Sequence, residues 1–293
     1  MKQEDMAYSL FGIFDVSIPV TYGEGQQRAM GRLLQEVLTR SGDVSILAWT
    51  GKASDYNSCL PAEISVYHEP VSPYVPSPIE DGEMGALVAE LRTSSKIVES
   101  AVILYDQVVV LPSPRLVSRR LSLSCFMFPL RGPLVPSDDS PQRRVYHTMT
   151  PTFGNVEIKT TEDLSGLNNL VLVHPWLRCL LDPTFPFEDD AEPFTPFDED
   201  SGGGGSDAQL TIPHLPSSSN TVSSSHHSPQ LDKLTRALRL LVRLRQPFGA
   251  LLLVHISFNE YKRVAPDHPI VVQLLGAISP RYLAQKIRTL DIL

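Results

Sequence analysis

One glycine-rich turn has the residue types of an anion-binding loop. The segment Tyr22-Gly23-Glu24-Gly25 precedes a helical pattern, and free backbone amides at a helix N-terminus attract anions. The segment lacks both the G-x-G-x-x-G spacing and the Lys-Ser/Thr pair of a Walker loop. The carboxylate of Glu24 would also repel a phosphate. We therefore interpret the segment as a structural turn, with ligand binding as the alternative.

The other reactive side chains form no catalytic or metal-binding pattern. The histidines show no H-E-x-x-H motif and no zinc-site spacing to cysteine, and no serine lies in a G-x-S-x-G elbow. The carboxylates Glu188, Asp189 and Asp190 are adjacent, but they lie in an expected linker, where nothing buries them to shift a pKa and make an acid–base pair. We expect no catalytic residue, no metal site and no cofactor. The histidines are His68, His147, His174, His214, His226, His227, His255 and His268.

Net charge, cysteine content and apolar stretches indicate which partners and which cellular compartment to expect. A formal net charge of -8 and a pI near 5.5 argue against a nucleic-acid partner, which needs a basic field. Cys59, Cys125 and Cys179 are odd in number and widely spaced, which favours buried, reduced thiols in a cytoplasmic protein. The apolar stretches are shorter than the roughly 18 residues of a membrane span. We therefore expect a cytoplasmic protein with no membrane span.

The first 65 residues predict two helices and a short strand. From Glu4 on, apolar residues recur at helical spacing as far as Phe14. A second helix follows the glycine-rich turn and should end at Ser41-Gly42, because glycine accepts the left-handed conformation there. Residues 43–49 then resemble a short buried strand.

The middle of the chain predicts a linker and then a β-rich region. Five prolines between positions 61 and 78 exclude a long helix, so we place a proline-rich linker at 66–82. Residues 83–93 could form a short helix. Apolar runs rich in β-branched residues then predict strands in a region spanning 83–182. These runs are 98–104, 108–111, 121–130, 156–161 and 170–173.

The last third predicts a linker, a helix and further strands. Residues 183–230 combine acidic, glycine and serine runs, a composition typical of a disordered linker. In the closing region, 231–293, residues 231–245 have the pattern of an amphipathic helix. Its cationic residues could dock on a membrane or a partner groove, but packing on the β-rich region is the simpler interpretation. A buried strand is expected at 248–256. The whole chain is therefore expected to be α+β.

Residues 1–65 resemble part of a known family. Its residues, in their order, resemble the block that follows the domain core in fungal heterokaryon-incompatibility (HET-domain) proteins. Further along, 260–263 and 288–293 look like the C-terminal extension of the mushroom-type members. The residues that carry the N-terminal resemblance are Glu4, Asp5, Ala7, Tyr8, Leu10, Gly12, Ile13, Phe14, Pro19, Tyr22, Gly23, Glu24, Gly25 and Trp49.

The resemblance implies a role in self/non-self recognition, leading to growth arrest or programmed cell death. Residues 1–65 would be the C-terminal part of a HET domain, and the blocks that open that domain have no match in this sequence. We therefore expect an N-terminally truncated, non-catalytic member. One alternative is an NAD-hydrolysing effector, if a HET core exists upstream, because the family is similar in fold to TIR domains. The other alternative is an inactive truncated paralogue.

Truncation would leave apolar surface for a partner. We expect a protein partner, or the missing HET core, to cover the N-terminal helices, and without it an exposed apolar patch. The residues of that expected patch are Met6, Leu10, Phe11, Leu33, Leu34, Val37 and Trp49.

Overall fold

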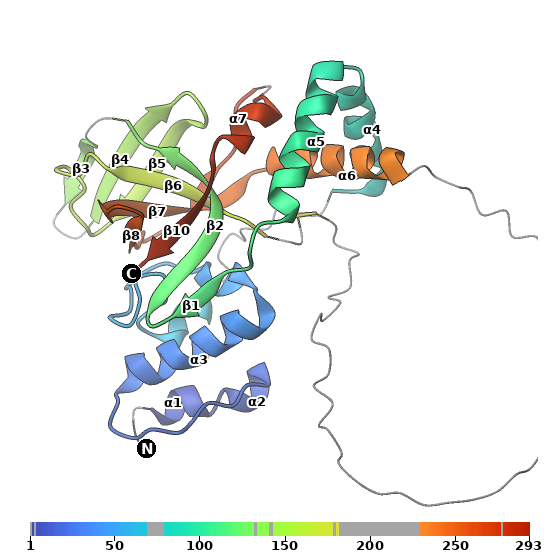
Figure 1. Ribbon diagram of the computed structural model, residues 1–293. Helices are drawn as coiled ribbons and strands as arrows, with labels where there is room; N and C mark the ends of the chain where they lie inside the picture. Colours follow the sequence, from blue (N-terminus) through green and yellow to red (C-terminus); the bar gives the residue numbers. More distant parts are fainter. Residues whose placement is uncertain are drawn as a thin grey trace, which may run out of the picture.

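The chain has a mixed α+β fold, as the sequence predicts. The computed structural model describes residues 2, 4–68, 79–131, 134–140, 143–177, 180–181, 229–276 and 278–293. Figure 1 shows helices at the N-terminal end, strands in the middle and a second group of helices beside the strands. The expected linker at 183–230 lies outside the described residues, except for its last two positions. Most of the expected linker at 66–82 also lies outside them.

The N-terminal part contains three α-helices. The single helix expected at the start is two short ones, α1 (Asp5–Tyr8) and α2 (Phe11–Phe14). Helix α3 (Gln26–Ser41) follows the glycine-rich turn. It ends as predicted, because Gly42 adopts a φ of 61° and its N–H donates to the Leu38 carbonyl oxygen at 2.8 Å.

The strand expected at 43–49 is wrong. Residues Val44–Leu47 form the 3₁₀-helix η1, and Ile64–His68 form a second one, η2. The Asp43 carboxylate accepts hydrogen bonds from the backbone N–H and the hydroxyl of Ser45, at 2.8 and 2.7 Å. This capping stabilises a turn and competes with the extended backbone.

A second helical group lies beside the strands (Figure 1). Helices α4 (Asp81–Arg92) and α6 (Pro229–Leu244) confirm the helices predicted at 83–93 and 231–245. Helix α5 (Ser95–Val109) contradicts the strands predicted at 98–104 and 108–111. The short helix α7 (Pro280–Ala284) packs against α5, as does α6.

Tertiary packing explains why α5 is a helix despite its β-branched residues. Ala101, Leu104 and Val108 are buried on one face, at the three- and four-residue spacing of a helix. That face packs against α6 and α7. Burial of this stripe outweighs the β propensity of valine and isoleucine.

The strands form one sheet that closes on itself and a separate three-stranded sheet. Strand β2 pairs with β10 and β6, β6 pairs with β7, β7 with β8, and β8 with β10. The closure makes a small barrel, with β1 and β9 attached to β2 and β7. A second sheet has the order β3-β4-β5. The bounds are β1 (Arg115–Val117), β2 (Arg120–Pro129), β3 (Pro136–Ser140), β4 (Arg143–Thr150), β5 (Gly154–Thr160), β6 (Leu170–Pro175), β7 (Phe248–Ser257), β8 (Glu260–Val264), β9 (Ile270–Val272) and β10 (Ile287–Ile292).

These strands confirm the predictions at 121–130, 156–161, 170–173 and 248–256. The expected apolar patch, by contrast, is wrong for three of its seven members. Leu33, Leu34 and Trp49 are each at most 1% exposed, because the loop after η1 and the barrel cover them. Met6 is 43% exposed, and the remaining residues of the expected patch are half-buried.

Candidate functional site

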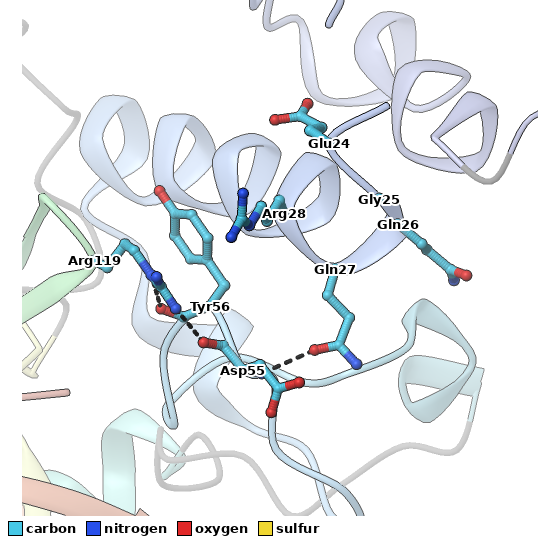
Figure 2. Close-up of a pocket in the computed structure, with 8 residues that line it drawn as sticks. All are labelled: Glu24, Gly25, Gln26, Gln27, Arg28, Asp55, Tyr56 and Arg119. Atoms are coloured by element: carbon cyan, nitrogen blue, oxygen red, sulfur yellow. Dashed lines mark hydrogen bonds between the residues drawn. The ribbon is translucent and has the colours of Figure 1, made fainter. Parts of the chain in front are cut away.

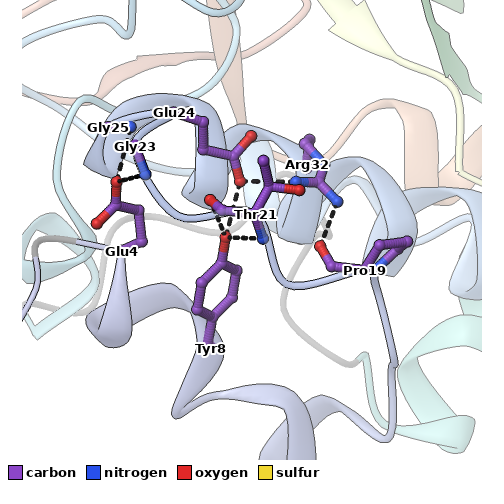
Figure 3. A network of polar contacts seen from close by, with 8 residues as sticks. All are labelled: Glu4, Tyr8, Pro19, Thr21, Gly23, Glu24, Gly25 and Arg32. Carbon is purple, nitrogen blue, oxygen red and sulfur yellow. Dashed lines mark hydrogen bonds and ion pairs between the residues drawn. The ribbon is translucent and has the colours of Figure 1, made fainter.

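Five residues of the N-terminal resemblance, Glu4, Tyr8, Gly23, Glu24 and Gly25, meet in one polar network between α1 and α3. The Glu4 carboxylate accepts hydrogen bonds from the backbone amides of Gly23 and Gly25, at 2.9 and 3.0 Å. Gly25 has a φ of 85°, which glycine adopts without strain. The anion-binding feature of the turn is therefore occupied by a carboxylate of the chain itself (Figure 3).

A tyrosine and an arginine fasten the same loop. The Tyr8 hydroxyl lies 2.8 Å from the Thr21 carbonyl oxygen and 2.9 Å from Oε1 of Glu24. Arg32 donates from Nη1 to Glu24 Oε1 and from Nη2 to the Pro19 carbonyl oxygen, both at 2.6 Å. The loop between α2 and α3 is thus hydrogen-bonded to α1 through Tyr8 and to α3 through Arg32 (Figure 3).

The network shifts the pKa values of two of its groups, the Glu4 carboxyl and the Tyr8 hydroxyl. The backbone amides of Glu4 itself, Gly25 and Gly23 hold the pKa of the Glu4 carboxyl below its ordinary value. The pKa of the Tyr8 hydroxyl is raised, chiefly by burial. Both shifts keep the groups in the protonation states that the network uses, an ionised Glu4 and a neutral Tyr8.

An open pocket of about 420 Å³ lies beside the network. Arg119 donates to the backbone carbonyls of Asp55 and Tyr56, and its guanidinium carbon lies 5.3 Å from the centre of the Tyr56 ring (Figure 2). The Asp55 N–H donates to Gln27 Oε1 at 2.8 Å. Arg28 and Glu24 complete the charged lining. With two cations and two carboxylates the pocket is balanced in charge, so its charge favours no single class of small ligand.

The other motif residues lie in different surroundings. Ala7 is fully buried, whereas Ile13 is 73% exposed and Phe14 38%. Gly12 is exposed, while Asp5 and Leu10 are half-buried. Pro19 and Tyr22 belong to the loop of the network. Trp49 lies apart from it and contacts the barrel.

Trp49 packs against Arg263 of β8 and forms a buried junction with it. The Arg263 guanidinium carbon lies 3.9 Å from the centre of the Trp49 ring, and Arg263 is 2% exposed. Its Nη1 donates to the Leu47 carbonyl oxygen at 2.8 Å and its Nη2 to that of Trp49 at 2.7 Å. The indole N–H of Trp49 donates to the Cys59 carbonyl oxygen at 2.8 Å.

Further hydrogen bonds join the same loop to β10. The Asn57 side chain donates to the carbonyl oxygens of Ile292 and Arg119, at 2.8 and 2.9 Å. The Ser58 N–H donates to the Leu293 carbonyl oxygen at 2.9 Å. The segments 43–49, 260–263 and 288–293, noted separately in the sequence, therefore meet at one structural junction.

The remaining chemical candidates do not come together in one site. His147 and His268 are exposed, and Nε2 of the half-buried His255 lies 2.7 Å from the Phe258 carbonyl oxygen. His174 is buried and stacks on Phe248, with the ring centres 3.8 Å apart. Cys59 and Cys125 are free and buried, and burial raises the pKa of the Cys59 thiol to about 12. Cys179, the carboxylates at 188–190 and the histidines at 214, 226 and 227 lie outside the described residues.

Two absences hold for the described part of the chain. It contains no cluster of three or more His, Cys, Asp or Glu side chains that could bind a metal ion. Within the same residues, no helix is both long and apolar enough to cross a membrane.

Sequence reasoning missed the partners of the motif residues. Arg32 lies within the resemblance, but nothing in the pattern indicates its contact with Glu24, which lies outside the helix. Arg263 could have been found, because alternation along β8 puts it on the same buried face as Tyr261, opposite the exposed Lys262. An arginine on a buried face needs hydrogen-bond partners.

A curated relative matches a short stretch of this chain. Over 54 residues the chain is 46% identical to the vegetative incompatibility protein HET-E-1 of Podospora anserina. This similarity supports a heterokaryon-incompatibility-related family for the chain. The match covers 18% of this chain and 4% of the relative, so the chain spans only a small part of that protein's length. No family model matches the chain, and no solved structure matches it.

Proposed function

We propose that this chain acts in fungal self/non-self recognition, and that residues 1–65 form the C-terminal part of a HET domain of the mushroom type. The observation that carries the proposal is the 46% identity over 54 residues to a vegetative incompatibility protein. The similarity by itself supports a function related to vegetative incompatibility. Growth arrest and cell death as its outcome are part of the proposal.

The chain acts by binding a protein, without catalysis of its own. The polar side chains of the motif are engaged with one another: Glu4 with the turn amides, and Tyr8 and Arg32 with Glu24. Beside them, Ile13, Val20 and Tyr22 are 73%, 53% and 54% exposed. Exposed apolar side chains next to a rigid polar clamp support a protein partner at this end of the molecule.

The chain acts in the cytoplasm. Free, buried thiols at Cys59 and Cys125 support a reducing compartment. A fluorescent fusion expressed in hyphae should give a diffuse cytoplasmic signal, and a secreted or organellar signal would contradict this part of the proposal.

Expression in a fungal strain tests the recognition function. We expect the chain to cause growth arrest or cell death, and Ile13→Asp to weaken that effect by placing a charge on the partner surface. The matched control is Val110→Asp, which changes a side chain that is 76% exposed at the end of α5. Absence of any growth phenotype from the unaltered chain would count against the function.

A separate assay tests the non-catalytic part. The purified chain is incubated with NAD and the nucleotide is followed by chromatography, with a boiled sample as control. We expect NAD to remain unchanged. Hydrolysis would instead favour the TIR-like alternative.

A further inference from the structure

A groove of about 800 Å³ lies between α5 and α7, with the end of α6 at its side. We call it the α5–α7 groove. It is larger than the pocket beside α3, and its volume is that of a site that holds a sizeable ligand. None of the residues of the N-terminal resemblance lines it.

The groove is cationic in a chain that is acidic overall. Its lining includes Lys96, Arg245 and Arg281 against the single carboxylate of Glu99, whereas the chain carries a net charge of -8. Among the described residues, no carboxylate forms an ion pair with any of these three cations. Arg245 Nε is buried and has no hydrogen-bond partner within this same part of the chain. Glu90 acts electrostatically on Arg245 without forming an ion pair with it. Three cations against the one carboxylate in the lining still create a field that favours an anionic ligand.

The groove also presents apolar surface. Ile103 lines it and is 50% exposed, and Ile97 is half-buried one and a half turns earlier on α5. An inorganic anion would leave this surface in water. A peptide that carries both carboxylates and large apolar side chains would cover it while pairing with the cations.

One segment of this chain has that composition. Residues 185–200 combine four phenylalanines with seven acidic side chains. The phenylalanines are Phe185, Phe187, Phe194 and Phe197, and the acids are Glu188, Asp189, Asp190, Glu192, Asp198, Glu199 and Asp200.

The chain leaves the described structure close to the groove. The carbonyl oxygens of Leu180 and Leu181 accept hydrogen bonds from Nη1 of Arg243, at 2.9 and 3.0 Å. Arg243 lies two residues before Arg245 of the groove. The seven residues from 181 to 188 can span up to roughly 23 Å, so the acidic segment is within reach.

We propose that the α5–α7 groove binds residues 185–200 of the same chain. The acidic side chains pair with Lys96, Arg245 and Arg281, and phenylalanine side chains cover the isoleucines. Tethering at Leu181 keeps the local concentration of the segment high, so contacts that are individually weak suffice.

Photo-cross-linking of the full chain tests this binding. A benzoylphenylalanine replaces Ser100, which lines the groove, and cross-linked peptides are identified by mass spectrometry. We expect cross-links to residues 185–200. The matched control carries the same group at Val20, which is 53% exposed in the loop before α3, and should give none to that segment.

Charge reversal distinguishes specific binding from chance contact. The pair Lys96→Glu and Arg281→Glu, both at exposed positions, should lower the cross-link yield by about tenfold. Lys262→Glu on β8 makes the same change outside the groove and should leave the yield unaltered. Circular dichroism melting curves check that each variant folds.

Three results would overturn the proposal. They are an absence of cross-links to 185–200, a yield that charge reversal leaves unchanged, and cross-links between molecules in a mixture of isotopically light and heavy chains. The third result would assign the groove to a second copy of the chain.

Discussion

Two arginines stabilise two regions of this molecule, and they differ in burial and in the kind of partner that they contact. Arg32, in the N-terminal network, keeps 25% of its side chain exposed and faces the carboxylate of Glu24. Arg263, in the junction with Trp49, is 2% exposed and meets backbone carbonyl oxygens and an aromatic ring. The first pair remains close to water, so its energetic contribution is small. The second is desolvated, and its carbonyl partners depend on it. The motif residues around Glu4 and Glu24 therefore form a local clamp, whereas Trp49, the last residue of the motif, belongs to the buried junction.

Removal of the buried cation should have the largest effect. Arg263→Met keeps an unbranched side chain of similar length but removes the donors to three buried carbonyl oxygens. We expect the free energy of unfolding to fall by about 3 kcal/mol, the order of magnitude for losing buried hydrogen bonds to a charged group. Urea denaturation followed by circular dichroism measures it.

The same change at the partly buried pair is the matched control. Arg32→Met should lower the free energy of unfolding by about 1 kcal/mol, less than Arg263→Met, because Arg32 and Glu24 both keep some contact with water. Equal losses in the two variants would show that the contrast between the junctions is wrong.

A substitution of the Trp49 ring separates the contribution of the indole from that of the Arg263 guanidinium. Trp49→Phe keeps an aromatic face beneath Arg263 but removes the indole N–H that donates to the Cys59 carbonyl oxygen. We expect a loss of about 1 to 2 kcal/mol, measured in the same way. A loss as large as that of Arg263→Met would mean that the indole, and not the guanidinium, is the main component of the junction.

The local clamp should appear mainly in the pH dependence. Because the folded chain holds the pKa of Glu4 below its ordinary value, its contribution is present at neutral pH and is lost as the pH falls through the folded pKa. We therefore expect the unaltered chain to lose stability more steeply than Glu4→Gln below about pH 4.5. Thermal melting between pH 7 and pH 3 compares the two, and parallel curves would contradict the role of Glu4.

The sequence predicts best the elements whose signals are local. Strand β6 and strand β7 follow from short apolar runs between breakers, and α6 from its amphipathic pattern. For the residues of helix α5 the sequence predicts strands, because valine and isoleucine have high β propensity; the packing of α6 and α7 decides the outcome instead.

Contacts between distant residues could not be predicted. The contact of Glu4 with Gly23 and Gly25 spans about twenty residues, and that of Trp49 with Arg263 spans more than two hundred. Pattern analysis finds the turn, but it does not reveal that a carboxylate of the chain binds its amides. For the same reason it places Trp49 in an exposed patch, when the barrel covers it.

The position of β10 in the barrel has a consequence for synthesis of the protein. Strand β10 lies between β2 and β8, which come before it in the chain, so β2 has no partner on that side until residues 287–292 have left the ribosome. Such non-local pairing slows folding and exposes an unpaired strand edge to other chains. We therefore expect the barrel to close only once residues 287–292 have been synthesised and can pair with β2 and β8.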